Sequence, residues 1–374
     1  MSQQHNFDQL VAAMIGAAPG ISDLLFIPGQ PPLVHSLGSL QPYRGSLAEA
    51  VVSPQFTANL AATLINRSEL LEDDLQSNGS CDCAYVVPDL ARFRVNIYRQ
   101  MGQLAVVMRK LPNTVPTLEE LGLPEVFASI VKERNGIVFI TGAASMGKTT
   151  TLAAILNEIN RTEAVHIVTL EDPIEYLHSP ARATFSQREL GKDFFSYPVG
   201  LRAALRQAPR VILVGEIRDR DTMEAALTAA ETGHVVFTTL HTIDAGQTIN
   251  RILGMFTKEE EPLIRQRLTD TFRWVASQRL VSKAGGGLQL VTEVMGSNLR
   301  SREVLLEGES EKRNLHEIIE SNLSPYGWHS FEQSLLKAYL AGLITEETAV
   351  LHSTHKNQIS QAIDRSRHLR VIPA

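Results

Sequence analysis

The feature that most constrains the fold is the segment from Asn135 to Arg161, NGIVFITGAASMGKTTTLAAILNEINR. Residues 137–140 form a short β-branched and aromatic run, which predicts one buried strand. The sequence GAASMGKT that follows matches G-x-x-x-x-G-K-[ST], and residues 150–159 continue with apolar residues at helical spacing. A strand, a glycine-rich turn and a helix in this order form the context that this pattern requires. The segment therefore predicts a nucleoside-triphosphate site.

The chemistry of phosphate binding explains this spacing. Gly142 and Gly147 let the backbone turn tightly, so that its N–H groups point at an anion, and the helix N-terminus adds partial positive charge. Lys148 reaches the β- and γ-phosphates, and the Thr149 hydroxyl can ligate Mg²⁺. The predicted nucleotide-binding residues are Gly142, Ala143, Ala144, Ser145, Met146, Gly147, Lys148, Thr149 and Thr150, with Thr149 as the predicted metal ligand.

The composition is that of an ordinary globular protein. A length of 374 residues is enough for two or three domains, and the net charge of −6 argues against a nucleic-acid partner. No apolar run approaches 18 residues, and the N-terminus lacks the basic and apolar regions of a signal peptide, so we expect no membrane insertion. The two cysteines, Cys81 and Cys83, are poorly placed for a disulfide and too few for a four-cysteine zinc site. We expect a reducing, cytoplasmic compartment.

The first hundred residues predict a small mixed α+β domain. Helices are expected at residues 7–15 and 56–65 and a strand at residues 23–27. Residues 92–98 alternate strictly and residues 100–103 turn the chain back into residues 104–108, which predicts a hairpin with Phe93, Val95 and Ile97 on its core face. Arg92 and Arg94 fall on the opposite face, which by default is a solvated one.

Strands and helices alternate after a linker that contains three prolines. Strands are expected at residues 137–141, 165–170, 211–215, 234–240 and 288–294. Helices are expected at 149–160, 198–207, 222–232 and 246–256, with a long one at 259–280. This order predicts a mostly parallel sheet with helices on both faces, followed by short helices from about residue 297. Asp221 with Glu224, Asp244, and Ser330 with Gln333 are predicted helix caps. The predicted division is a first domain at 1–111, a linker at 112–123, a nucleotide-binding core at 124–296 and a helical region at 297–374.

Three further strands end in polar residues, and ligands of such sheets lie at the carboxyl ends of strands. Glu171 follows the strand that Pro173 stops, and its alternative role is that of a capping acid in a turn. Glu216, after an apolar strand, is the first choice for the catalytic base, since a carboxylate there can polarise the attacking water. His241 could sense the γ-phosphate, although a single histidine is more often structural.

These motifs together resemble a known family. GAASMGKT, TLEDPIEYLH, RAALRQAPRVILVGEIRDRDTMEAALTAAETGH and FTTLHTIDAGQTINRIL are similar to the motifs of the secretion-ATPase superfamily, and most similar to those of the retraction motors of bacterial type IV pili. SDLLFIPGQPPLVHSLGSLQPY and ARFRVNIYRQ resemble the PAS-like N-terminal domain of that family. The resemblance spans roughly residues 6 to 355.

The resemblance implies both a fold and a function. The implied fold is α/β, with a PAS-like α+β N-terminal domain, a RecA-like P-loop ATPase domain and a helical C-terminal part. The implied function is that of a homohexameric motor that hydrolyses ATP with Mg²⁺ to retract a pilus, as in twitching motility. It would be cytoplasmic, peripheral at the inner face of the cytoplasmic membrane, and docked on an inner-membrane platform protein.

The resemblance also implies residue roles. Lys148 and Thr149 take the phosphate and Mg²⁺ roles, Glu171 lies in the acidic box, and Glu216 is the catalytic glutamate of an atypical Walker B strand. His241 lies in the histidine box. Arg94 and Arg109 match arginines that reach the bound nucleotide, as arginine fingers do, which replaces the default interpretation of the Arg94 face.

Three departures from the family pattern stand out. Ser145-Met146 replaces the usual Gly-Ser, Arg210 replaces a common Asp before the Walker B strand, and residues 297–314 match the helix motif required for retraction only loosely.

Three alternatives stay open. A pilus-extension or type II secretion assembly motor would carry a four-cysteine zinc insertion and a further N-terminal domain. A hexameric helicase or recombinase would need a basic channel. An accessory retraction paralogue would bind ATP only for assembly.

Overall fold

The structure is a computed structural model that describes residues 3–45, 50–310, 314–322 and 326–371. It separates into two compact units, which are described here one at a time. The first comprises Met1–Val115, Asp172–Leu177 and Glu189–Asp193, and the second comprises Pro116–Glu171, His178–Arg188 and Phe194–Ala374. The domain limits predicted from the sequence stay a prediction. Residues 311–313, part of the loosely matching segment 297–314, lie outside the described residues.

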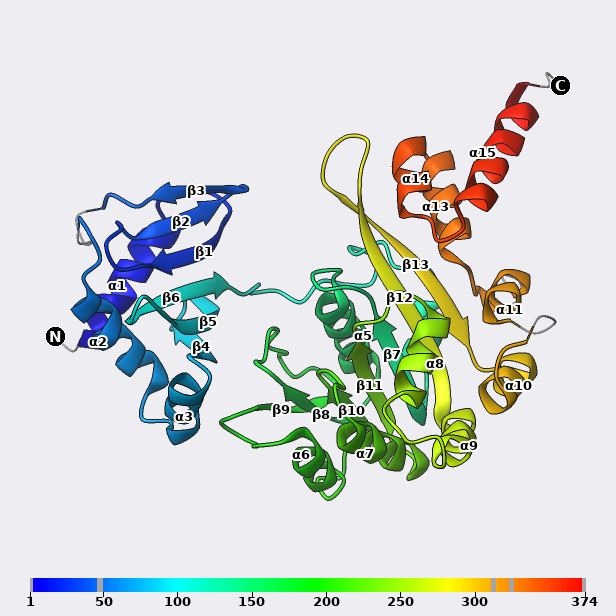
Figure 1. The fold of residues 1–374 in the computed structure, drawn as a ribbon, viewed down its shortest axis with the longest axis horizontal. Helices are drawn as coiled ribbons and strands as arrows, with labels where there is room; N and C mark the ends of the chain where they lie inside the picture. The colour runs from blue at the N-terminus through cyan, green and yellow to red at the C-terminus, as the bar shows by residue number, and fades with distance from the viewer. Residues whose placement is uncertain (1–2, 46–49, 311–313, 323–325, 372–374) are drawn as a thin grey trace. The chain divides into compact units, whose positions relative to one another are not determined.

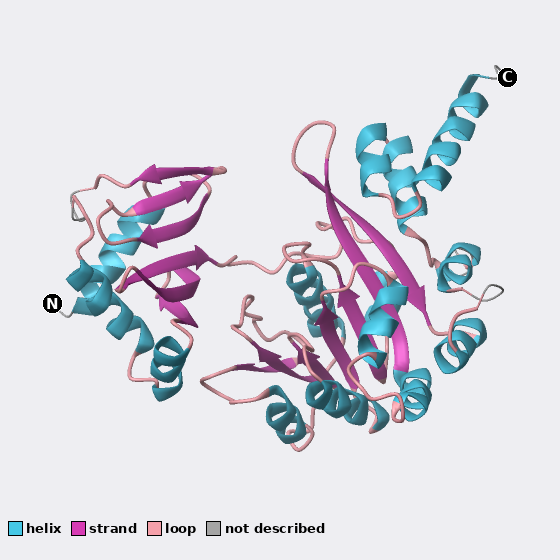
Figure 2. Ribbon diagram, in the orientation of Figure 1, coloured by secondary structure: helices cyan, strands magenta, loops and turns pink. Residues whose placement is uncertain are grey.

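The first unit contains a six-stranded antiparallel sheet in the order β3-β2-β1-β6-β5-β4 (Figures 1 and 2). Its strands are β1 (Ile21–Phe26), β2 (Leu33–Ser36), β3 (Ser39–Pro42), β4 (Ser80–Val87), β5 (Ala91–Gln100) and β6 (Gln103–Lys110). Three helices accompany it: α1 (Gln3–Ile15), α2 (Pro54–Ile65) and α3 (Glu69–Ser77).

The predicted hairpin is formed by β5 and β6, and its core face is confirmed. Phe93, Val95 and Ile97 are fully buried and belong to one hydrophobic cluster with Met14 of α1 and Leu60 of α2. The alternation of the sequence thus placed these side chains correctly, because a half-buried strand has a side-chain period of two.

The second unit contains a seven-stranded sheet in the order β13-β12-β7-β11-β10-β8-β9. Its strands are β7 (Gly136–Thr141), β8 (His166–Glu171), β9 (Thr184–Glu189), β10 (Val211–Val214), β11 (Val235–Leu240), β12 (Phe272–Ser282) and β13 (Leu288–Gly296). The pairs β12–β7, β7–β11, β11–β10 and β10–β8 are parallel, whereas β12–β13 is antiparallel. The predicted α/β class, with a mostly parallel sheet, is therefore confirmed.

Helices follow the strands of this unit in the expected order. They are α4 (Phe127–Val131), α5 (Lys148–Thr162), α6 (Tyr197–Ala204), α7 (Arg220–Glu231), α8 (Ala245–Leu253) and α9 (Glu261–Thr271), followed by α10 (Leu299–Glu307), α11 (Leu315–Ser321), α13 (Phe331–Leu340), α14 (Glu346–His352) and α15 (Lys356–Val371). Ile155 and Ile159 of α5 pack in one hydrophobic cluster with Val138 and Ile140 of β7. The apolar spacing of α5 thus secures the P-loop helix to the strand before it.

Two predictions are wrong. The long helix expected at residues 259–280 ends at Thr271, and the chain continues as β12 between β7 and β13. The predicted capping pair Asp221–Glu224 does not form, because Asp219 is the N-cap of α7 and accepts a hydrogen bond from the Thr222 N–H at 2.8 Å. The caps predicted at Asp244 and at Ser330 with Gln333 are confirmed.

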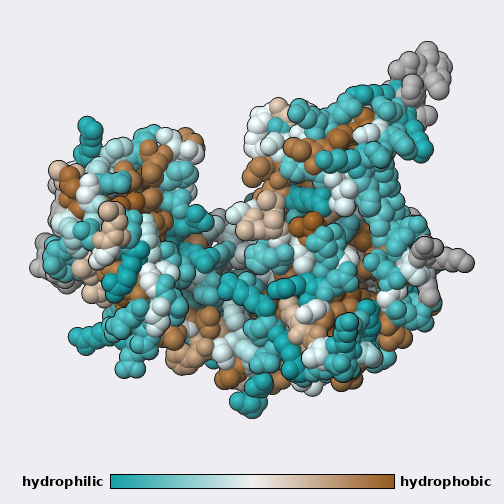
Figure 3. All heavy atoms as spheres, viewed as in Figure 1, coloured by the Kyte–Doolittle hydropathy of each residue, from teal (hydrophilic) through white to brown (hydrophobic). Residues whose placement is uncertain are grey.

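The surface mixes apolar and polar residues. Leu299 on α10 is 87% exposed and Leu306 on the same helix is 43% exposed. On the face drawn in Figure 3, hydrophobic residues are interspersed with hydrophilic ones. Among the described residues, no helix is long and apolar enough to cross a membrane.

Candidate nucleotide site

The P-loop lies between β7 and α5 and has the backbone of a phosphate cradle. Gly142 has a φ of 147°, and a Cβ added there would lie 2.7 Å from the carbonyl oxygen of Gln278, so only glycine fits. Gly147, with a φ of 80°, is the N-cap of α5 and provides no side-chain cap. The N-terminus of this 15-residue helix carries partial positive charge at the loop, which fits the predicted phosphate site.

Ser145 and Met146 occupy the positions at which the loop departs from the family pattern. Ser145 has a φ of 64°, a left-handed conformation that glycine adopts more readily than serine. The sulfur of Met146 lies 3.2 Å from the N–H of Leu280 on β12. The large Met146 side chain therefore packs toward the sheet, and the loop keeps its backbone shape.

Lys148 is buried at the first turn of α5. Its ammonium donates hydrogen bonds to the carbonyl oxygens of Gly142 and Ala143, both at 2.8 Å. It also lies 3.5 Å from Nδ1 of His241, the residue that follows β11. The ammonium group is therefore held inside the loop, where its charge can be shared with a phosphate oxygen.

His241 lies between Lys148 and Glu216. Its Nε2 is 3.6 Å from Oε2 of Glu216. Burial and the charge of Lys148 lower the pKa of His241, more than the charge of Glu216 raises it. The ring is thus neutral near pH 7, and because Lys148 can only donate, Nδ1 accepts and Nε2–H faces the Glu216 carboxylate.

Glu216 is oriented from two sides. It lies two residues beyond β10, and its other oxygen, Oε1, forms a salt bridge with Arg218. Glu216 is 17% exposed, whereas Arg218 is 73% exposed. Arg218 was not predicted from the sequence. Its position two residues after the predicted base is the sequence feature that could have identified it.

Glu171 ends β8 beside this group. It is buried, and Oε1 accepts a hydrogen bond from the Thr169 hydroxyl at 2.6 Å. Gly215 lies where the two strand ends approach closely, since its N–H donates to the Leu170 carbonyl oxygen at 2.8 Å and a Cβ there would lie only 3.2 Å from the same oxygen. The parallel registers thus bring the ends of β7, β8, β10 and β11 to one edge of the sheet, as predicted.

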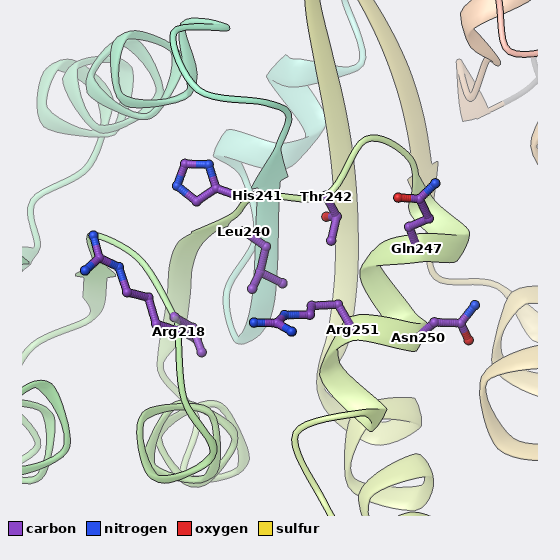
Figure 4. Close-up of a pocket in the computed structure, with 8 residues that line it drawn as sticks. Arg218, Leu240, His241, Thr242, Gln247, Asn250 and Arg251 are labelled. Atoms are coloured by element: carbon purple, nitrogen blue, oxygen red, sulfur yellow. The ribbon is translucent and has the colours of Figure 1, made fainter.

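A cleft of 760 Å³ opens beside His241 and Arg218 (Figure 4). α8 contributes Gln247, Asn250 and Arg251 to its lining, and Figure 4 shows the Arg251 side chain extending from this helix toward Leu240. Two guanidinium groups therefore line a cleft that adjoins the predicted catalytic residues. Arg251 was not assigned from the sequence, because a single arginine on a helix face carries no distinctive signal.

The predicted arginines lie in the first unit. Arg94 on β5 is directly opposite Arg109 on β6. Arg109 donates a hydrogen bond to Asp23 at 2.9 Å. Arg94 makes longer ion pairs with Asp82 and Glu175, both at 3.8 Å. Their contact with a nucleotide stays a prediction.

Arg92, which the sequence placed on the same face as Arg94, is mostly buried. It pairs with Glu189 at 2.7 Å and bonds to the Ile174 carbonyl, both within the first unit. An acid therefore accounts for the charge of Arg92.

The nucleotide chemistry follows from these positions. When bound, ATP would supply the phosphoanhydride bond, with Thr149 as the residue placed to hold Mg²⁺. Lys148 and the N-terminus of α5 would hold the phosphates, and Glu216 would take up the proton of the attacking water. His241 lies between Lys148 and Glu216, because its neutral ring is near both the ammonium and the carboxylate.

Comparison with known proteins identifies relatives of the whole chain. Residues 50–320 match the family described as type II/IV secretion system protein. The chain is 36% identical to the type IV pilus retraction ATPase PilT of Pseudomonas aeruginosa over 89% of its length and 94% of that protein. It is 33% identical to the type IV pilus ATPase PilU of the same organism, over 94% of this chain and 90% of that one.

A solved structure has the same fold. The crystal structure of the pilus retraction motor PilT with bound ADP superposes with a TM-score of 0.83 at 35% identity, covering 94% of this chain and 99% of that one. The P-loop geometry and these matches lead to one conclusion. The chain belongs to the type II/IV secretion system protein family and is a PilT-like, nucleotide-binding ATPase of the secretion-ATPase superfamily.

Proposed function

We propose that this chain is the subunit of a homohexameric motor that hydrolyses ATP, with Mg²⁺ held by Thr149, to power type IV pilus retraction. The observation that carries the proposal is the chain of contacts from Lys148 through His241 to Glu216 at one edge of the sheet. This arrangement connects Lys148, which binds phosphate, to Glu216, which activates water. Binding of the γ-phosphate can therefore change the position or charge environment of the Glu216 carboxylate.

The roles of the site residues are part of this proposal. Lys148 binds the β- and γ-phosphates, Glu216 is the general base, and His241 senses the γ-phosphate. Glu171, in the acidic box, is a further catalytic residue. Residues 142–150 surround the nucleotide. The chain acts at the inner face of the cytoplasmic membrane, docked on a platform protein.

Arg94 and Arg109 act as arginine fingers in this proposal. Arg94 and Arg109 place two guanidinium groups directly opposite each other on the hairpin. Arg109 pairs with Asp23 at 2.9 Å, whereas Arg94 makes longer ion pairs with Asp82 and Glu175, both at 3.8 Å, which a phosphate group could replace. In a ring, the fingers would be supplied to the site of a neighbouring subunit.

Lys148→Ala and Glu216→Gln test the assignment. Lys148→Ala should lose nucleotide affinity, because one charge-assisted phosphate contact contributes about 1.5–3 kcal/mol. Glu216→Gln should bind ATP normally and turn over at least tenfold more slowly. Equilibrium binding of a fluorescent ATP analogue beside steady-state phosphate release measures both. A normal rate for Glu216→Gln would remove this residue from the role of base.

The second candidate function is that of an accessory retraction ATPase. It is favoured by the similarity to PilU, which is nearly as high as that to PilT. An accessory subunit would support retraction only when another motor is present, so a motility assay in a deletion strain separates the two functions.

A further inference from the structure

Three metal-ligating side chains meet in the C-terminal part of the second unit. His316 and Glu320 lie four residues apart on α11, so they share one face of that helix, and Glu332 lies on α13 (Figure 1). One ligand atom from each of the three lies within 4.8 Å of the others. Within the part of the chain that the structure describes, this is the one such group of three.

Glu332 is the buried member of the group. It is 4% exposed, and its Oε1 accepts hydrogen bonds from the Ser353 hydroxyl and from the N–H groups of Thr354 and His355, at 2.8–2.9 Å. Its Oε2 is buried and has no hydrogen-bond partner among the described residues. A buried carboxylate oxygen without a donor is costly, and a cation beside it would remove the cost.

His316 and Glu320 are already oriented toward each other. Glu320 Oε1 lies 3.7 Å from His316 Nε2 and accepts hydrogen bonds from Ser330 and Gln358, both at 2.9 Å. Such hydrogen bonds fix the direction of a carboxylate ligand while leaving lone pairs for a metal. The amide oxygen of Gln358 lies 3.3 Å from His316 Nε2, so this exposed side chain covers the group.

A pocket of 180 Å³ borders the group at His316. His316 lines it together with three acidic residues, Asp244, Glu293 and Glu309. Lysine and arginine are absent from the described residues that line the pocket, so its charge favours entry of a cation.

We propose that His316, Glu320 and Glu332 bind a divalent transition-metal ion, with Zn²⁺ as the best match. One imidazole and two carboxylates suit Zn²⁺, whereas Mg²⁺ and Ca²⁺ prefer oxygen ligands throughout. Zinc takes such ligands at about 2.0–2.2 Å, so the three atoms must close in slightly, which the half-exposed His316 and Glu320 side chains can do by small rotations. The ion would fasten α11 to α13.

The test uses the full chain, stripped of metal with a chelator and free of nucleotide, so that it does not depend on the proposed motor function. Zn²⁺ affinity and stoichiometry are measured by competition with a chromophoric chelator. The variants are His316→Ala and Glu332→Gln, in which the amide oxygen keeps an acceptor for the three donors. Glu317→Gln is the matched control, because Glu317 is exposed on the same helix. Circular dichroism verifies folding, and Glu320→Gln replaces any variant that fails to fold.

The expected result is one equivalent of Zn²⁺, bound at least tenfold more weakly by both variants and unchanged in the control. Co²⁺ should give absorption bands without the thiolate charge transfer that Cys81 or Cys83 would produce. The proposal is overturned if no stoichiometric ion binds, if the variants bind like the unmodified chain, or if the thiolate band appears.

Discussion

Glu293 offers a test of the electrostatics around α8. This residue of β13 is 6% exposed and accepts a hydrogen bond from the N–H of Ala245, the first residue of α8, at 2.9 Å. Burial raises its pKa from the ordinary 4.5 to about 7, and Asp244 and Glu332 add to the rise while Arg279 opposes it. We therefore expect Glu293→Gln to stabilise the second unit at alkaline pH.

The sign follows from proton linkage. The pKa of Glu293 is higher in the folded protein than in the unfolded chain, so the folded protein binds this proton more tightly. The contribution of Glu293 to stability is therefore fully present below pH 4.5 and is lost as the pH rises through about 7. With 1.36 kcal/mol for each tenfold change, the full loss is about 3 kcal/mol, of which about 2 kcal/mol falls between pH 5.5 and pH 8.5. Glutamine has no such dependence and keeps an oxygen for the Ala245 N–H.

The assay is urea unfolding at pH 5.5 and 8.5, in chelator and without nucleotide. Tryptophan fluorescence reports on the second unit, because both tryptophans, Trp274 and Trp328, lie there. The difference in unfolding free energy between Glu293→Gln and the unmodified chain should become about 2 kcal/mol more favourable at pH 8.5. The exposed Glu317→Gln should show no such change. Equal differences at the two pH values would refute the assignment of a raised pKa.

Three other predictions concern the nucleotide site. Gly142→Ala should abolish nucleotide binding, measured with a fluorescent ATP analogue, because its Cβ would lie 2.7 Å from a backbone oxygen; normal affinity would contradict the loop geometry. Arg218→Ala should slow ATP turnover by up to about fivefold with little change in Tm, since an exposed ion pair contributes about 1 kcal/mol or less; a large fall in Tm would show a structural role instead. Mixing Arg94→Ala subunits with Lys148→Ala subunits should restore ATPase activity if the arginine acts across the ring, and mixed rings no more active than either variant would contradict this.

The strands, turn and helix around the P-loop are the part of the fold that the sequence predicted best. Each of its elements is local: a short apolar strand, a glycine turn, and an acidic or histidine residue at a strand end. Parallel pairing then brings Glu171, Glu216 and His241 to one edge, the carboxyl ends of the strands, where the ligands of open α/β sheets bind. What the sequence could not supply was the tautomer of His241 and the orientation of Glu216 by Arg218, which depend on side chains that converge only in the folded sheet.

The edge of that sheet was predicted less well. Between Pro262 and Gly285 no glycine or proline marks the end of α9, and β12 lacks the alternation of a half-buried strand. Because β12 lies between β7 and β13 and is covered on both faces, Val275 and Ala276 are both buried. The apolar pattern of residues 272–280 is therefore compatible with a helix and with a strand that is buried on both faces. Only pairing with β7, which the sequence does not reveal, makes this segment a strand.

Whether this chain powers pilus retraction is measured by motility and pilus counts in a strain that lacks the gene. We expect the deletion strain to stop twitching and to carry more surface pili, because assembly continues without retraction. The unmodified chain should restore twitching, whereas Glu216→Gln should not. Loss of pili in the deletion strain would indicate an assembly motor, and unchanged twitching would indicate an accessory role; either result would contradict the claim.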